Sequence, residues 1–268
     1  MSMDAWSSMD AWSRLSAELD LWQQAGRVAT LWWRDDDAIS DTPALRRLLE
    51  VAQVPLALAV IPARLQPSLI ACLDKLPATQ HVAVLQHGFS HDNHEPAERK
   101  KAELGAARPV ERVLAELGQG GDRLRTAFGA RALPVLTPPW NRIAPAVIAG
   151  LPGLGFQGLT TYLPRPQAMP IPGLVQVNTH VDIIDWHQGR GFLGEEPSLA
   201  LLIKHLQARR LGTADAAEPT GLLTHHLVHD EACWGFLTRL QHWLSAYPVI
   251  RWVRGEAAFT TVVQRTDQ

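Results

Sequence analysis

A regular alternation of short β-rich runs with helical stretches, along nearly the whole chain, most constrains the fold of this sequence. Eight runs are expected to form strands, at residues 28–34, 54–61, 81–86, 132–137, 156–161, 174–179, 220–225 and 249–253. Strands that alternate with helical patterns are typical of βα units and a parallel sheet. The sequence therefore predicts an α/β fold, a distorted (β/α) barrel of about seven or eight parallel strands in a single domain.

Helical periodicity occupies the segments between these runs. Apolar residues recur at helical spacing over residues 96–117 and again over residues 231–246, which predicts a helix in each segment. Pro43 and Pro67 stand where a first helical turn accepts proline, so we expect a helix to begin at each. Residues 163–173 contain four prolines and are expected to form a long irregular loop.

The composition is that of a globular chain large enough to bury a substantial core. Of its 268 residues, 46% are hydrophobic and 19% are charged, and the formal net charge is −2. Without a long Lys/Arg run, neither a nucleic acid nor an anionic membrane surface is an expected partner. No secretory signal pattern and no run of about 18 apolar residues is found, so we expect a cytoplasmic protein. The oligomeric state is left open.

The first residues contain a direct repeat, in which the sequence SMDAWS at residues 2–7 recurs at residues 8–13. A repeat of six residues is too short for a solenoid unit. We therefore expect residues 1–13 to be a disordered, repeated N-terminus and residues 14–268 to form the barrel domain.

Polar residues of particular types follow several of the predicted strands. In a parallel barrel, functional groups gather at the carboxyl ends of the strands. The residues concerned are Arg34 to Asp37 after the first strand, His87 and His91 after the third, Thr137 to Arg142 after the fourth, Asp182 to Trp186, and His225 after a later strand. Other polar residues nearby are interpreted as solvated or loop-positioning residues: His94, His180, Asp182 and His187.

Each motif has an ordinary structural explanation when it is taken alone. Three consecutive aspartates can cap a helix or face water, and two histidines four residues apart can be solvated. Together, however, a carboxylate and two imidazoles at one barrel face form a three-ligand set that leaves positions for water and substrate, as in a catalytic zinc site. The sequence thus predicts a divalent metal ion, zinc by its ligand types, with a second aspartate as general base and His225 as general acid. His226 and His229 follow closely and are alternatives for the acid.

The order of these motifs resembles that of the NodB-like polysaccharide deacetylases, the carbohydrate esterase family 4, over about residues 28–230. This resemblance implies a base aspartate followed by a metal-binding aspartate. Asp36 is taken as the base and Asp37 as the ligand, with Asp35 and Asp36 as the alternative register. The family motif His-x-x-x-His matches His87 and His91, which the resemblance makes metal ligands.

The same resemblance assigns the remaining motifs. Residues Thr137 to Trp140 are similar to the family's Arg-x-Pro-aromatic motif, which implies that the backbone N–H of Trp140 helps to bind the developing oxyanion. Asp185 and Trp186 resemble the fourth motif, in which the aspartate supports a charged partner and the tryptophan walls the pocket. His225 lies in the fifth motif, whose histidine is the acid.

The arginine of the third motif is missing, because Thr137 stands in its place. In the family this arginine orients the base aspartate. Arg34 and Arg142 are the candidates to replace it, and we favour Arg142 because it lies on the loop beside Trp140. Asp185 is expected to anchor whichever arginine is used.

These residues and the resemblance predict a metal-dependent hydrolase that removes an acyl group, an acetyl group by the resemblance, from an amide nitrogen of a carbohydrate or small sugar-like substrate. One alternative is a metal-independent, allantoinase-like C–N hydrolase of the same superfamily, against which the intact Asp and His-x-x-x-His set argues. The other is a catalytically inactive sugar-binding relative, which the missing arginine makes conceivable.

Overall fold

Nine strands form a single sheet in the computed structural model, which describes residues 9–260. Every paired strand is parallel to its neighbour, in the order β6-β5-β4-β3-β2-β1-β8-β7, and β9 pairs with β1 as well. The strands are β1 (Ala29–Ala38), β2 (Leu56–Val60), β3 (Val82–His87), β4 (Ala132–Thr137), β5 (Gly158–Leu159), β6 (Val175–Gln176), β7 (Val181–Asp182), β8 (Thr220–Thr224) and β9 (Ile250–Trp252).

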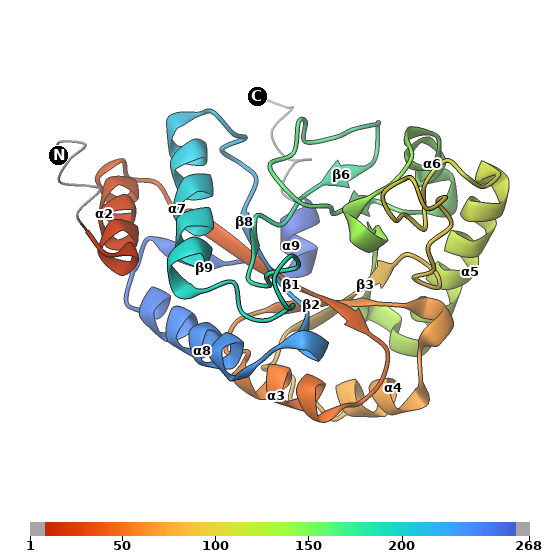
Figure 1. Cartoon of the computed structure of the whole chain (residues 1–268), viewed down its shortest axis with the longest axis horizontal. Helices are drawn as coiled ribbons and strands as arrows, with labels where there is room; N and C mark the ends of the chain where they lie inside the picture. The colour runs from red at the N-terminus through yellow and green to blue at the C-terminus, as the bar shows by residue number, and fades with distance from the viewer. Residues whose placement is uncertain (1–8, 261–268) are drawn as a thin grey trace.

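Helices surround this curled half-barrel, as Figure 1 shows. The α-helices are α2 (Ala11–Gln24), α3 (Pro43–Val51), α4 (Pro67–Asp74), α5 (Val110–Phe128), α6 (Pro145–Gly150), α7 (Glu195–Leu211), α8 (Glu231–Ser245) and α9 (Gly255–Thr260). Short 3-10 turns are η1 (Pro62–Arg64), η2 (Gly129–Arg131), η3 (Pro139–Asn141), η4 (Pro152–Leu154) and η5 (His226–Val228). The predicted distorted (β/α) barrel in a single domain is confirmed.

Each of the eight predicted runs overlaps a strand of the sheet, although β1 continues past the predicted end at Arg34 to Ala38. The runs at residues 156–161 and 174–179 shorten to the two-residue strands β5 and β6, and the two-residue strand β7 corresponds to none of the predicted runs. The prolines also lie where they were expected, since Pro43 is the first residue of α3 and Pro67 the first of α4. Thr42 caps α3 by accepting a hydrogen bond from the N–H of Leu45 at 3.0 Å.

The predicted helix over residues 96–117 is right only from Val110 onward, because α5 begins there and continues to Phe128. The preceding residues form an irregular segment in which Glu95 and Glu103 turn inward and bind backbone N–H groups. Gly105 and Pro109 lie in this segment, and both oppose continuation of a helix. The predicted helix over residues 231–246 is confirmed as α8, which Asp230 caps through the N–H of Cys233.

The N-terminal boundary lies earlier than residue 14. Residues 1–8 of the expected tail are outside the described residues, but the second copy of the repeat enters α2 at Ala11. Asp10 caps this helix by accepting from the N–H of Ser13 at 2.9 Å. Ala11 is buried, and the indole of Trp12 donates to Glu195 of α7, so these residues are part of the domain.

The two tryptophans of β1 point to opposite sides of the sheet. Trp33 packs in the large core between the sheet and its helices, and Trp32 packs with Phe259 of α9, edge to face at 5.7 Å, in a second core. Both are 1% exposed, as expected for barrel core residues. Within the described range, the structure contains no helix that is both long and apolar enough to span a membrane.

Candidate active site

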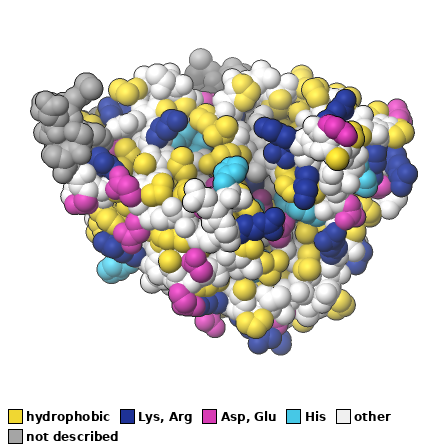
Figure 2. Space-filling view, viewed as in Figure 1, with side chains coloured by type: hydrophobic (Ala, Val, Ile, Leu, Met, Phe, Trp, Pro, Cys, Tyr) yellow, Lys and Arg dark blue, Asp and Glu magenta, His cyan; other side chains and the backbone are white. Residues whose placement is uncertain are grey.

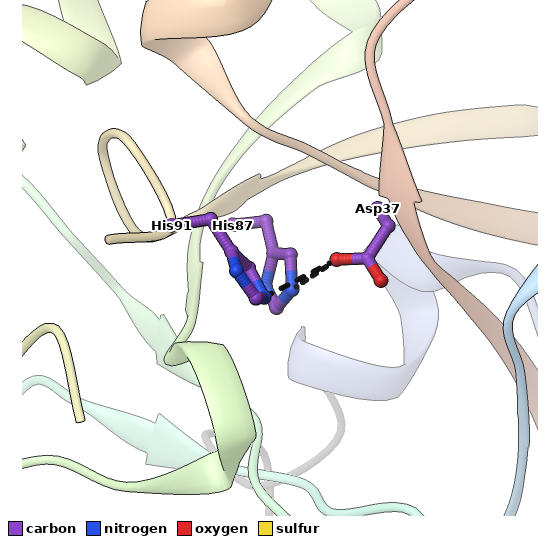
Figure 3. A group of neighbouring side chains, drawn as sticks. All are labelled: Asp37, His87 and His91. Carbon is purple, nitrogen blue, oxygen red and sulfur yellow. Dashed lines mark ion pairs between the residues drawn. The ribbon is translucent and has the colours of Figure 1, made fainter. Parts of the chain in front are cut away.

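Three side chains at the carboxyl ends of β1 and β3 point toward one another (Figure 3). The Oδ1 atom of Asp37 lies 3.2 Å from Nε2 of His87 and 3.3 Å from Nε2 of His91. His87 is the last residue of β3, and His91 lies on the loop that follows it. Their three ligand atoms all lie within 4.8 Å of one another. The structure thus brings together the three residues that the sequence predicts as metal ligands.

The hydrogen bonding of His87 suits a metal ligand. Its Nδ1 lies 3.0 Å from the carbonyl oxygen of Thr137, which can only accept. Nδ1 therefore carries the proton, and the lone pair of Nε2 faces Asp37. Oδ1 of Asp37 is buried and makes no hydrogen bond within the part of the chain that the structure describes. A divalent cation fits this set of one carboxylate and two imidazoles.

Burial and neighbouring charges act on all three groups. Burial opposes protonation of His87, but the charges of Asp36 and Asp37 raise its pKa. Burial opposes ionisation of Asp37, but the neighbouring His87, with His225 and His91, lowers the pKa of Asp37 below its usual value. Burial and the neighbouring His87 lower the pKa of His91. At neutral pH the carboxylate is therefore ionised and His91 is neutral, the states in which each group can bind a cation.

Unusual backbone conformations are concentrated here. Among the described residues six non-glycine residues have a positive φ, and four of them belong to this site: Asp37 at 73°, His91 at 60°, Trp140 at 57° and Asn141 at 56°. In β1 the register with β2 gains one extra residue between Asp35 and Ala38, which is a β-bulge. Such strain is typically kept where function requires a particular side-chain direction.

Arg34 holds Asp36 in the interior of the barrel. Its guanidinium donates to both carboxylate oxygens of Asp36, at 2.8 and 3.0 Å, and both side chains are buried. The remaining donors reach Oδ1 of Asn141 at 2.9 Å, Oγ1 of Thr160 at 2.8 Å and the carbonyl of Thr161 at 3.2 Å. A bidentate arginine fixes both the charge and the orientation of a carboxylate.

Arg142 was favoured for this place, and the structure contradicts that prediction. The Arg142 guanidinium donates to the carbonyl oxygen of Lys101 at 2.7 Å, in an exposed position. Arg34 binds Asp36 instead, because it lies two residues before Asp36 on the same strand and the two side chains therefore share a face of the sheet. Arg142 lies beyond the 3-10 turn η3, whose Trp140 and Asn141 have positive φ.

Asp35 points away from this centre and joins two strands. Its carboxylate accepts from Oγ1 of Thr224 at 2.6 Å, from the N–H of His226 at 3.0 Å and from the His226 imidazole. Burial opposes the charges of the pair, but their attraction lowers the pKa of Asp35 and raises that of His226. Asp35 lies outside the set around Asp37, so the geometry favours the register with Asp36 and Asp37 over the register shifted by one.

His225 is the histidine of this segment that faces Asp36. Its Nε2 lies 3.9 Å from Oδ2 of Asp36, and its ring contacts that of Trp186 edge to face at 4.6 Å. His226 is held by Asp35, and the ring of His229 packs on Trp234 at 4.4 Å. Only His225 of the three therefore lies beside the predicted base.

Besides Asp36, the carboxylate that interacts electrostatically with His225 is Asp182, and the prediction that Asp185 supports a charged partner is wrong. Asp185 accepts hydrogen bonds from the backbone N–H groups of His187 and Gln188 at 2.9 Å, which closes its own loop. Asp182, in contrast, accepts from the indole of Trp186 at 2.8 Å. Burial raises the pKa of Asp182, and the nearby His225 partly offsets that rise.

The predicted oxyanion residue lies against the candidate ligands. The indole ring of Trp140 is 4.5 Å from the ring of His91. In the space-filling view, histidine side chains lie near the middle of the face shown, with Lys and Arg side chains beside them (Figure 2). Residues that the sequence did not identify complete the surroundings: Asn141 and Thr160, which bind Arg34, and Glu103, which binds the loop of His91.

A second buried group of possible ligands lies at the opposite, amino-terminal end of β8, formed by His180, His205 and Glu218. The N–H of Gly221 donates to Nδ1 of His180 at 2.9 Å, so the proton of a neutral His180 must be on Nε2. Binding a metal through Nε2 would require an imidazolate. The rings of His180 and His205 also stack at 3.3 Å, nearly parallel. We therefore assign this group to the core, not to a metal.

Comparison with known proteins gives a fold-level match. No protein-family model and no curated protein sequence matches the chain. The family 4 acetyl xylan esterase from Clostridium thermocellum, solved with a cobalt ion, matches with a TM-score of 0.55 and 15% identity over 87% of this chain and 91% of that one. The chitin deacetylase from the fungal pathogen Colletotrichum lindemuthianum matches with a TM-score of 0.51 and 15% identity, over 85% and 86%.

A third structure extends the same pattern. The family 4 carbohydrate esterase from Streptomyces lividans, in complex with acetate, has a TM-score of 0.51 and 14% identity over 83% of this chain and 90% of that one. These identities are too low to transfer residue roles. In fold, the chain is similar to the carbohydrate esterases of family 4 and to chitin deacetylase, as its motifs predicted.

Proposed function

We propose that this protein is a metal-dependent hydrolase that removes an acyl group, most simply acetyl, from an amide nitrogen of a carbohydrate or small sugar-like substrate. The observation that carries the proposal is the convergence of Asp37, His87 and His91 beside an aspartate, Asp36, that Arg34 holds with two hydrogen bonds. The fold shared with structures named as esterases and deacetylases supports the same reaction class.

Asp37, His87 and His91 would hold the metal ion, for which zinc suits the ligand types. Bound there, the ion would polarise the acyl carbonyl and lower the pKa of the attacking water. Asp36 takes the proton from that water, because Arg34 fixes the direction of its carboxylate and keeps it available as a base.

The remaining residues act on the other side of the scissile bond. The backbone N–H of Trp140 donates to the acyl oxygen as negative charge develops there. His225, beside Asp36, gives a proton to the departing nitrogen, and Asp182 helps to hold the charged form of His225. The products are a free amine and a carboxylate. The indole ring of Trp186 is suited to stacking on a sugar ring of the substrate.

The experiment combines metal analysis with an amine-release screen over N-acetylated sugars and small amides. Purified protein should contain close to one divalent ion per chain, and at least one N-acetyl sugar should release acetate and amine in equal amounts. His87→Ala and His91→Ala should lose most of the metal and the activity while keeping a native circular dichroism spectrum. His94→Ala, an exposed histidine three residues after His91, is the matched control and should keep both.

The results separate this proposal from its alternatives. Full metal content in both histidine variants would remove the assigned site. Activity that survives exhaustive chelation would favour a metal-independent C–N hydrolase, and bound sugar without turnover would favour an inactive sugar-binding protein.

A further inference from the structure

The carboxylate of Glu103 lies beneath the loop that joins His87 to His91. Its Oε1 accepts from the N–H groups of Phe89 at 3.1 Å and Ser90 at 2.7 Å, and from the Ser90 hydroxyl at 3.2 Å. Its Oε2 accepts from the N–H of His91 at 3.1 Å. Three successive backbone N–H groups thus converge on one anionic side chain, an arrangement that binds anions strongly. Glu103 itself is 1% exposed, so these donors are not shared with solvent.

The loop conformation depends on this carboxylate. Gly88 has a φ of 56° and His91 one of 60°, which turns the intervening N–H groups to one side. A Cβ atom at position 88 would lie only 2.0 Å from Oε2 of Glu103 and 2.7 Å from Pro139. Gly88 is therefore required both by its φ and by the close approach of Glu103.

Glu103 belongs to an irregular segment, residues 92–109, that we call the strap. The strap is closed on itself by the hydrogen bond from His94 N–H to the Ala102 carbonyl at 3.1 Å. It also reaches the loop after β4, because Arg142 donates to the Lys101 carbonyl and the N–H of Ala144 donates to the Leu104 carbonyl at 2.8 Å. The strap thus ties the loop of His91 to the chain that follows Trp140.

We propose that Glu103 is a positioning residue that holds His91 in its ligand conformation and so sets the metal affinity of the site. The inference rests on the proposed metal site. His91 needs such support because it lies on a loop and its side chain is 20% exposed, whereas His87 ends a buried strand and is held by the Thr137 carbonyl. A ligand whose direction is fixed before binding does not have to be ordered by the metal.

The test is the metal affinity of Glu103→Gln. The glutamine side chain has one oxygen where Glu103 has two. Its NH₂ group would therefore face a backbone N–H donor that a carboxylate oxygen of Glu103 accepts from in the wild type. The dissociation constant for Co²⁺, measured by competition with a chromophoric chelator, should rise roughly 10- to 100-fold. The visible absorption bands of the Co²⁺-loaded variant should also shift, since the geometry of the His91 ligand changes. Glu98→Gln, an exposed glutamate on the same strap, is the matched control and should bind as wild type does.

Three results would contradict the role of Glu103 or the proposed metal site. Wild-type Co²⁺ affinity and spectrum in a folded Glu103→Gln protein, even one with a lowered melting temperature, would make Glu103 a purely structural residue and overturn the inference. If Glu103→Gln does not fold, Glu103→Asp is tested instead, because it retains the charge but moves it away from the loop. An unchanged Co²⁺ affinity in Glu103→Asp would likewise overturn the inference. Metal retained in His87→Ala would instead refute the proposed function itself.

Discussion

Replacement of Arg34 offers the sharpest test of how the candidate base is held. Arg34 is fully buried and donates five hydrogen bonds, two of them to Asp36, which is 2% exposed. In Arg34→Met the Asp36 carboxylate stays buried without its counter-charge. Breaking a buried ion pair from one side costs about 3–5 kcal/mol, so we expect a loss of this size in the free energy of unfolding.

The double variant Arg34→Met/Asp36→Asn separates the charge effect from packing. Because neither charge remains, most of the lost unfolding free energy should return, as is usual when both partners of a buried pair are neutralised. Stability would be measured by urea denaturation of metal-free protein, so that metal binding does not contribute.

Turnover is tested by the milder change Arg34→Lys. An ammonium group is a point donor and cannot hold both carboxylate oxygens of Asp36 in one plane. We expect turnover to fall about 10²-fold, the scale of a catalytic group that has lost its alignment, with the metal content unchanged. Arg142→Ala should reduce turnover by less than about tenfold, since that side chain only meets a backbone carbonyl. Near-normal turnover in Arg34→Lys, or a larger effect in Arg142→Ala, would refute the assignment.

Three further predictions follow from the site. Asp36→Asn should be inactive but metal-loaded and Asp37→Asn should lose the metal, as measured by elemental analysis; the reverse pattern would contradict the register. Asp182→Asn should reduce turnover, because a carboxylate that interacts with His225 is lost, whereas Asp185→Asn, which alters only hydrogen bonds within its own loop, should leave turnover near that of wild type. The raised pKa of His226 means that the folded protein holds the proton more tightly, so the free energy of unfolding should fall as the pH rises beyond about 6.5. Urea titrations from pH 6 to 9 should show this slope in wild type and a flatter one in His226→Gln, and equal slopes would contradict it.

The parts of the site that the sequence revealed are those in which neighbours along the chain act together. His87 and His91 are identified in the sequence because they lie four positions apart, and Asp37 because it follows a predicted strand. The Arg34 and Asp36 pair also carried a signal, since residues two apart on a strand share a face, but the resemblance drew attention to Arg142 instead. The β-bulge that gives Asp37 its direction has no such signature.

Other features depend on contacts that no local pattern encodes. Glu103 lies in a segment whose leucines and valines suggest a helix. Gly105 and Pro109 in the sequence oppose that helix, but nothing in the sequence indicates that Glu103 binds the His91 loop. The role of Asp182 over Asp185 likewise follows from how the loop after β7 closes. The sheet as a whole was predictable because strand periodicity is independent of such contacts.

The unequal strand lengths have a consequence for amide hydrogen exchange. β1 is ten residues long and pairs with β2, β8 and β9, whereas β5, β6 and β7 have two residues each. Amides of β1 should therefore exchange only on global unfolding, while the short strands at the two ends of the sheet order, β5 and β6 at one end and β7 at the other, open in smaller, local fluctuations. Local opening at these two ends would leave in place the central strand β1, which carries Arg34 and Asp36.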